Sequence, residues 1–212
     1  MLNRKILRLY LCTDSGMAGD RPLPRLVADA IAGGVTMVQV REKKASARAL
    51  YALALELKAL CAAKGVPMVI NDRLDIALAV GADGVHLGQS DLPAAEARRI
   101  LGEKGIVGVS ASTPRLALQA ASDGADYLGV GAMYPTGTKE DIAGVIGPGG
   151  MADIRAVTGI PIVGIGGINA YNADKVLEAG ADGVAVISAV LRAPDCRAAA
   201  SRLREVGRAP WE

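Results

Sequence analysis

Charged and polar side chains gather where the apolar run at 36–41 of this 212-residue sequence ends. Side chains alternate across a strand, so Gln39, Arg41 and Lys43 would share one face. Two cations beside an amide suit a polyanion such as a diphosphate, which accepts charge-assisted hydrogen bonds. The alternative is that both cations are solvated charges at a strand end. The face that they share with Gln39 favours a binding role.

Two carboxylates follow two other apolar runs. Asp72 comes directly after Asn71 at the end of the run 66–71, and Asp91 follows the run 84–88. Mg²⁺ is usually held by one or two carboxylates together with substrate phosphate oxygens and water. The pair therefore predicts a magnesium site beside the diphosphate. The alternative is structural, with each aspartate capping the helix that follows it.

A second group of residues indicates a second anionic ligand. Gly166 and Gly167 follow the run 161–165, and glycines let the backbone approach a phosphate closely. We interpret this segment as a monophosphate site, with a tight turn as the alternative. Ser110 and the single histidine, His86, also stand at strand ends, and for both a structural role is as consistent with the sequence as a functional one.

A repeated phrase identifies the elements that must position these residues. It occurs as AGGVTMVQV, VGADGVHLG, DGADYLGVG and AGADGVAVI, beginning at residues 32, 80, 123 and 179. Each copy passes from a glycine, which suits the left-handed end of a helix, into a valine-rich strand. The glycines of successive copies are irregularly spaced, so some strand–helix units lack the phrase.

The whole chain is predicted to alternate strands and helices. The expected strands are 6–13, 36–41, 66–71, 84–88, 106–110, 127–131, 161–165 and 183–187. The expected helices are 23–33, 46–64, 73–80, 93–102, 114–123, 149–158, 172–179 and 195–206. Eight such units predict an α/β protein with a single (β/α)8 barrel over residues 1–212, ending in a short tail at 207–212. An open doubly wound sheet is the alternative, but no GxGxxG sequence follows the first strand.

Composition excludes several classes of protein. The net charge is +2, with 24 basic and 22 acidic residues interspersed, which argues against a dedicated nucleic-acid binder. No apolar run is long enough to predict a membrane span. Three separated cysteines and one histidine form no zinc pattern, so we expect a protein of the reducing cytoplasm.

Several stretches together resemble the thiamine phosphate synthase family, also called thiamine-phosphate pyrophosphorylases. They are VQVREK (38–43), INDRLDIALAVGADGVHLGQSD (70–91), GVSA (108–111), YLGVGAMYPTGTK (127–139), VGIGGIN (163–169) and GADGVAVISA (180–189). The resemblance implies a transferase of thiamine biosynthesis. It would join hydroxymethylpyrimidine diphosphate to thiazole phosphate by a dissociative substitution, giving thiamine phosphate and diphosphate with Mg²⁺ as cofactor.

The resemblance also implies roles for individual residues. The pyrimidine diphosphate would contact Gln39, Arg41, Lys43, Asn71, Ser110 and Lys139, of which Arg41, Ser110 and Lys139 would be catalytic. Asp72 and Asp91 would hold Mg²⁺. The thiazole phosphate would contact Thr136, Thr138, Gly167, Ile187 and Ser188.

Two other functions remain open at this point. One is a thiazole tautomerase-like relative, which would have little use for a metal–diphosphate set, and the other is a non-catalytic phosphate-binding barrel. The expected partners are small molecules, with no nucleic acid and no membrane, and a homo-oligomer is possible. The sequence leaves open whether the segment 132–148 closes over the site.

Overall fold

A computed structural model describes residues 2–137 and 144–206 of the chain. Its eight parallel strands form a closed barrel in the order of the sequence, with β1 next to β8. The strands are β1 (Leu9–Cys12), β2 (Met37–Val40), β3 (Met68–Asn71), β4 (Gly84–Leu87), β5 (Ile106–Ser110), β6 (Tyr127–Val130), β7 (Ile162–Ile165) and β8 (Gly183–Val186). The predicted (β/α)8 barrel is confirmed.

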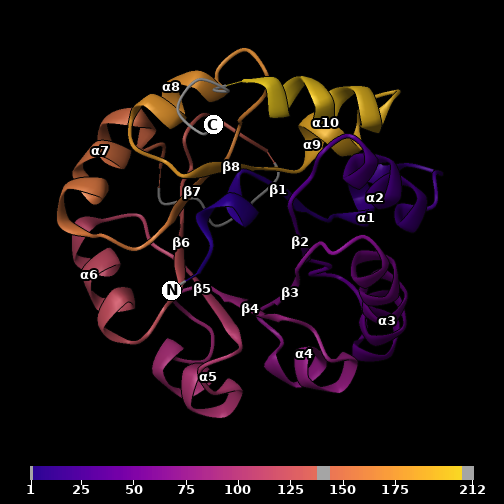
Figure 1. Cartoon of the computed structure of the whole chain (residues 1–212), viewed down its shortest axis with the longest axis horizontal. Coiled ribbons are helices and arrows are strands. Elements are labelled where there is room, and N and C mark those ends of the chain that lie inside the picture. The colour runs from indigo at the N-terminus through magenta and orange to yellow at the C-terminus, as the bar shows by residue number, and fades with distance from the viewer. Residues whose placement is uncertain (1, 138–143, 207–212) are drawn as a thin grey trace.

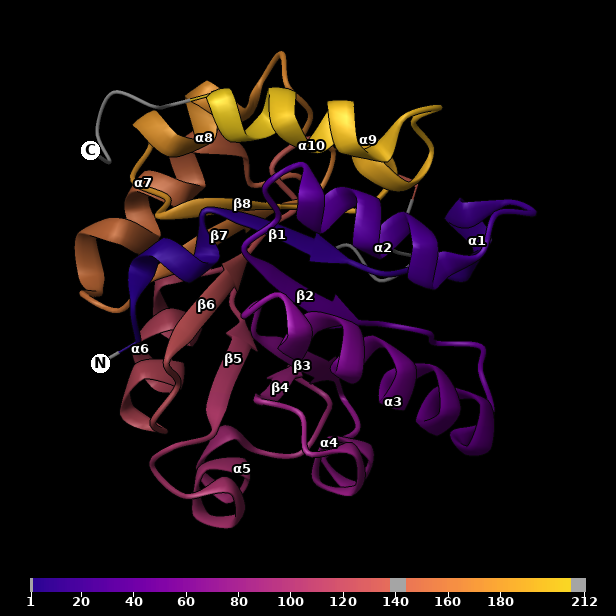
Figure 2. The same ribbon diagram turned by 45° about the vertical axis from the view of Figure 1, so that its right-hand side comes forward.

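Helices surround the strands on the outside, as Figure 1 and Figure 2 show. The main ones are α2 (Leu23–Ala32), α3 (Ala47–Ala63), α4 (Leu74–Val80), α5 (Ala94–Leu101), α6 (Pro114–Ser122), α7 (Gly147–Val157), α8 (Ala173–Glu178) and α10 (Cys196–Glu205). Three short helices were not expected from the sequence: η1 (Arg4–Leu7), α1 (Ser15–Ala18) and α9 (Ser188–Leu191). No helix in the described ranges combines the length and apolar character needed to cross a membrane.

The predicted strand 6–13 was wrong at its start. Residues 4–7 form the 3-10 helix η1, and the strand begins at Leu9. Leu7 is fully buried in the cluster that fills the barrel interior. A strand and a short helical turn can each bury an isolated leucine. The local hydrophobic pattern therefore could not distinguish the two structures.

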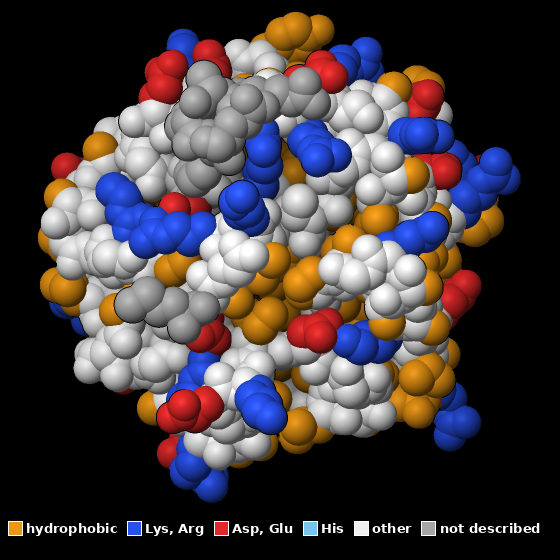
Figure 3. All heavy atoms as spheres, viewed as in Figure 1, with side chains coloured by type: hydrophobic (Ala, Val, Ile, Leu, Met, Phe, Trp, Pro, Cys, Tyr) orange, Lys and Arg blue, Asp and Glu red, His pale blue; other side chains and the backbone are white. Residues whose placement is uncertain are grey.

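The barrel interior and the shell outside it are two distinct apolar clusters. The interior cluster holds Leu7, Tyr10, Cys12, Met37, Val69, Tyr127, Val163 and Ala185. The larger cluster joins the outer strand faces to the helices and is made mainly of Ala, Val, Leu and Ile. On the face in Figure 3, basic and acidic side chains are interspersed, and hydrophobic side chains lie between them.

One contact recurs at four places, once in each copy of the repeated phrase. The residue two positions after the phrase's glycine donates its backbone N–H to a carbonyl of the preceding strand. Its side chain accepts the N–H of that same strand residue. The four pairs are Thr36 with Leu9, Asp83 with Met68, Asp126 with Val107, and Asp182 with Ile162. Each phrase leads into an even-numbered strand, so the repeating unit is two strands and two helices.

Candidate active site

The carboxyl ends of the strands surround a cavity of about 490 Å³. The structure brings eleven of the predicted site residues to its walls: Gln39, Arg41, Lys43, Asn71, Asp72, Asp91, Ser110, Thr136, Gly167, Ile187 and Ser188. Thr138 and Lys139 lie outside the described residues. Local sequence placed these residues at strand ends, and barrel closure makes those ends converge.

The residues after β2 alternate as their spacing predicted. Arg41 and Lys43 line the cavity with Gln39. Glu42 points elsewhere, because its carboxylate accepts hydrogen bonds from the Thr13 hydroxyl (2.7 Å) and from the Ser15 backbone N–H (3.0 Å). Glu42 therefore ties the end of β2 to the end of β1 and leaves the two cations on the cavity side.

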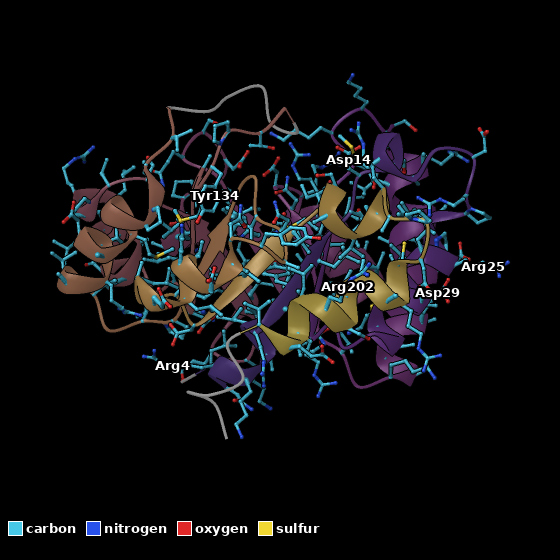
Figure 4. All side chains as sticks on the ribbon, turned by 90° about the horizontal axis from the view of Figure 1, so that it is seen from above. Arg4, Asp14, Arg25, Asp29, Tyr134 and Arg202 are labelled. Atoms are coloured by element: carbon cyan, nitrogen blue, oxygen red, sulfur yellow. The ribbon has the colours of Figure 1, made fainter. Side chains whose placement is uncertain are left out.

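Arg41 is a largely buried cation. Its Nη1 lies 3.8 Å from Oδ2 of Asp14, and its own backbone N–H donates to the Thr13 hydroxyl. Asp14 also caps α1 by accepting from the Gly16 N–H at 2.9 Å. Figure 4 shows Asp14 near the upper end of the barrel and Arg4 at the opposite end. A loosely held guanidinium beside a cavity can exchange a 3.8 Å contact for a stronger one with phosphate.

Asp72 and Asp91 form a carboxyl pair at the cavity wall. Burial, with a hydrogen bond and repulsion from the neighbouring Asp91 carboxyl group, raises the pKa of Asp72 to about 6. The positive charges of Lys43 and Arg41 act to lower the same pKa. The Nζ of Lys43 lies 3.7 Å from Oδ2 of Asp72. Two carboxylates that repel one another in a partly buried site are stabilised together by a cation.

The alternative prediction that these two aspartates cap the following helices is wrong. Helix α4 has Arg73 at its N-cap and α5 has Pro93, and neither makes a side-chain capping hydrogen bond. Asp91 instead accepts the backbone N–H of Gly88 at 2.7 Å, which closes the turn after β4. Asp72 has a left-handed backbone with φ of 62°, held by its N–H bonding to the His86 carbonyl.

Those two carboxylates are hard oxygen donors, which fits Mg²⁺. Among residues 2–137 and 144–206 there is no cluster of three or more His, Cys, Asp or Glu side chains able to hold a metal. The described residues would therefore supply two ligands and leave the remaining positions to substrate oxygens and water. This is the usual way in which proteins bind Mg²⁺ with a phosphorylated substrate.

Five polar side chains form a hydrogen-bond chain across the bottom of the cavity, which we call the floor chain. It runs from Gln39 Nε2 to Tyr10 Oη (2.9 Å), to Tyr127 Oη (2.8 Å), to His86 Nδ1 (3.0 Å), and from His86 Nε2 to Ser110 Oγ (3.0 Å). Burial raises the pKa of Tyr10 and of Tyr127 well above the usual range, so both hydroxyls stay neutral.

Two glycines make room for the floor chain. A Cβ on Gly108 would lie 2.1 Å from the Tyr127 ring, and one on Gly129 would lie 2.8 Å from the His86 ring. Residue 108 faces Tyr127 across the β5–β6 pair. These two strand glycines are therefore needed for the space that they leave, because any side chain would displace the rings.

The other end of the cavity is built from the segments after β7 and β8. Gly167 has φ of 65°, and a Cβ there would lie 2.7 Å from the Pro135 carbonyl oxygen, so glycine is required. The Tyr134 N–H donates to the Gly166 carbonyl at 3.0 Å, which fixes this turn against the segment after β6. Helix α9 begins at Ser188, directly after β8. A short extra helix beside the loops after strands seven and eight is where many such barrels bind phosphate.

Sequence reasoning assigned no role to several residues of the cavity. Tyr10 and Cys12 line it from β1, and Gln89 reaches across to donate to the Ser110 carbonyl at 2.6 Å. The two-residue spacing of Tyr10 and Cys12 could have placed both on the inner face of the first strand. Arg73, next to Asp72 in the sequence, pairs with Asp75 on the surface and does not line the cavity.

Comparison with known proteins identifies the family. Residues 9–190 match the family model described as "Thiamine monophosphate synthase". The chain is 54% identical over 197 residues to the thiamine-phosphate synthase of Chloroflexus aurantiacus, covering 93% of this chain and 91% of that one. It is 54% identical over 198 residues to that of Moorella thermoacetica, covering 93% and 94%.

A solved structure agrees with the sequence relatives. The thiamine phosphate pyrophosphorylase of Pyrococcus furiosus superposes with a TM-score of 0.87 at 41% identity, covering 96% of each chain. The fold, the convergence of the predicted residues and the extent of these matches lead to one conclusion: this chain belongs to the thiamine monophosphate synthase family.

Proposed function

We propose that this member of the family joins hydroxymethylpyrimidine diphosphate to thiazole phosphate, releasing diphosphate and forming thiamine phosphate. The observation that supports it best is that one cavity holds a carboxylate pair, a cationic face and a glycine-turn end. These three features suit a metal-bound diphosphate at one side and a monophosphate at the other.

The bond changes are balanced without an added base. The bond between the exocyclic carbon of the pyrimidine and the diphosphate oxygen breaks, and its electron pair leaves with diphosphate. The lone pair of the thiazole nitrogen then forms the new C–N bond. This dissociative substitution depends on stabilising the leaving group and on placing the two substrates.

Asp72 and Asp91 would hold Mg²⁺, which supplies positive charge to the diphosphate when bound. Arg41 and Lys43 reach the same side of the cavity and would donate hydrogen bonds to the diphosphate oxygens, with Asn71 beside them. We assign Lys139 to the same diphosphate. Cations aimed at developing negative charge lower the barrier more in a cavity than they would in water.

The second substrate would bind at the opposite end. Gly167, Ile187 and Ser188 line the cavity where α9 begins, and we assign the phosphate of the thiazole to them. Thr136, with Thr138, would contact the thiazole itself. Gln39 and Ser110, the two terminal residues of the floor chain, would hold the pyrimidine ring so that its exocyclic carbon faces the thiazole nitrogen.

Product formation tests the proposal directly. Purified protein with both substrates and Mg²⁺ should form thiamine phosphate and diphosphate in equal amounts. Isomerisation of the thiazole phosphate alone would support the tautomerase-like function instead. Binding of both ligands without turnover would support a non-catalytic barrel, and either result would overturn the synthase proposal.

Asp91→Asn separates the metal role from the turn that Asp91 closes. The amide keeps an oxygen for the Gly88 N–H but removes the negative charge. We expect Mg²⁺-dependent diphosphate binding to weaken by about 100-fold and thiazole phosphate binding to change less than about twofold.

The matched control for this variant is Asp75→Asn. Asp75 is exposed and pairs with Arg73 away from the cavity, so both binding constants should be unaltered. Equal weakening of both ligands in Asp91→Asn would show that Asp91 acts only by shaping the turn.

A further inference from the structure

The floor chain contains two tyrosines that the proposed chemistry does not use. Tyr10 and Tyr127 lie 117 residues apart in the sequence, are both essentially fully buried, and meet in the barrel interior with rings in an edge-to-face arrangement. They connect Gln39 on one side to His86 and Ser110 on the other.

The direction of the hydrogen bonds follows from the number of hydrogens. Gln39 Nε2 donates to Tyr10 Oη, so Tyr10 is an acceptor there and has one hydrogen left. Tyr127 Oη is the acceptor that the described residues show for that hydrogen. If Tyr127 donated to Tyr10 instead, the described part of the chain would show no hydrogen-bond acceptor for the buried Tyr10 hydrogen, which is strongly unfavourable.

The same reasoning continues to the other end of the floor chain. Tyr127 accepts from Tyr10 and therefore donates its own hydrogen to Nδ1 of His86. A neutral imidazole whose Nδ1 is an acceptor carries its proton on Nε2, which then donates to Ser110 Oγ. The hydroxyl hydrogen of Ser110 is thereby left to point at a ligand in the cavity.

We propose that Tyr10 and Tyr127 are positioning residues, which set the donor and acceptor pattern that the cavity presents to the pyrimidine ring. The floor chain holds the Gln39 amide with its nitrogen toward Tyr10, which leaves the carbonyl oxygen as an acceptor. At its other end it leaves Ser110 as a donor. An aminopyrimidine edge offers the complementary groups, an amino donor and a ring-nitrogen acceptor. This inference rests on the proposed function for the identity of the ligand.

The single histidine makes the direction of the floor chain measurable. Selective ¹⁵N labelling of histidine gives ring-nitrogen signals from His86 alone, in the free protein and without any substrate. We expect wild-type protein above pH 8 to show the Nε2-protonated tautomer. Tyr10→Phe should keep that tautomer, because Tyr127 still donates to Nδ1, whereas Tyr127→Phe should give a mixture. A wild-type protein protonated mainly on Nδ1 would overturn the proposal.

Steady-state kinetics measure the consequence for recognition. Both Tyr→Phe variants should raise the KM for the pyrimidine diphosphate by about tenfold, the effect of one lost buried hydrogen bond. The KM for thiazole phosphate should change less than about twofold. Equal changes in both constants, or none, would contradict the proposal.

Tyr51→Phe is the control for removal of a tyrosine hydroxyl, since Tyr51 is exposed on α3. The tautomer measurement needs no turnover. If the wild-type protein makes no thiamine phosphate, the proposed function fails while the His86 signals still decide the direction of the floor chain.

Discussion

The carboxyl group of Asp72 lies in surroundings that disfavour its ionised form. Its backbone is left-handed, its side chain faces a second carboxyl group, and its pKa is raised to about 6 by burial and by Asp91. The nearby cations Lys43 and Arg41 favour the ionised carboxylate, but they only partly offset the rise in its pKa. Under the proposed metal role, a bound divalent ion would favour the ionised form of both carboxyl groups.

This arrangement predicts a pH-dependent stability penalty. The folded pKa of about 6 lies above the ordinary 3.8, so the folded state holds this proton more tightly than the unfolded state. The free energy of unfolding should therefore lose a contribution as pH rises from about 4 to about 6, with little further change above.

Asp72→Asn isolates that contribution, because asparagine accepts a left-handed backbone and does not titrate. Relative to wild type in metal-free buffer, the variant should gain stability between pH 4 and pH 7 in urea unfolding. Added Mg²⁺ should reduce the difference in unfolding free energy between the variant and the wild type at pH 7. A stability difference that is the same at both pH values would contradict the assignment.

Side-chain contacts at the amino ends of the strands stabilise the repeating unit of two strands and two helices. In three of its four copies, an aspartate accepts a strand N–H and also pairs with a cation from a helix. The pairs are Asp83 with Lys58 of α3, Asp126 with Arg98 of α5, and Asp182 with Arg155 of α7. Such an aspartate links two neighbouring strands and the helix outside them, which is a structural role.

Asp126→Ala tests this role away from the cavity. Removing the carboxylate leaves the Val107 N–H without its acceptor and takes the ion pair from the partly buried Arg98, which keeps its bonds to backbone carbonyls. We expect a loss of about 2–3 kcal/mol in the free energy of unfolding, measured by urea denaturation.

Asp123→Ala is the matched control, since among the described residues the partly exposed Asp123 side chain accepts one hydrogen bond, from the Gln119 amide, and forms no ion pair. Its stability should change by less than about 0.5 kcal/mol. Equal effects of the two substitutions would show that the repeated aspartate adds nothing beyond a surface contact.

The two ends of the barrel have different tasks. At one end, η1 and the aspartate–cation pairs close the barrel, and Arg4 bonds both Asp182 and the Gly159 carbonyl. At the other end, the same strands stop at residues that line a cavity. Stability is concentrated at the amino ends of the strands and polar binding groups at the carboxyl ends, as is general for this fold.

Ligand binding at the carboxyl ends should stabilise the whole barrel. Mg²⁺ with diphosphate at 100 times its dissociation constant adds about 2.7 kcal/mol. For a chain of this size that corresponds to a rise in Tm of about 5–10 °C. Differential scanning calorimetry should show the rise with Mg²⁺ and diphosphate together, and its loss when EDTA removes the metal. A rise that persists in EDTA would exclude a metal bridge to the diphosphate.

Local sequence was sufficient for the eight strands, the eight main helices and one wall of the site. Glycine after a helical pattern and a valine-rich run placed the even-numbered strands, and the alternation between them placed the others within a few residues. Two-residue alternation put Gln39, Arg41 and Lys43 on one face. The start of β1 was misjudged because a buried leucine fits a strand and a short turn equally well.

The tertiary structure alone decided which of these residues meet. The floor chain joins residues of five strands, and the Asp72–Asp91 pair depends on how far each turn extends beyond its strand. Periodicity along one strand reports which side chains share a face, but not which strands lie opposite across a closed barrel. The alternation along β1 is therefore enough to predict which of its side chains face the barrel interior. The contact between Tyr10 and Tyr127, in contrast, exists only because the sheet closes on itself.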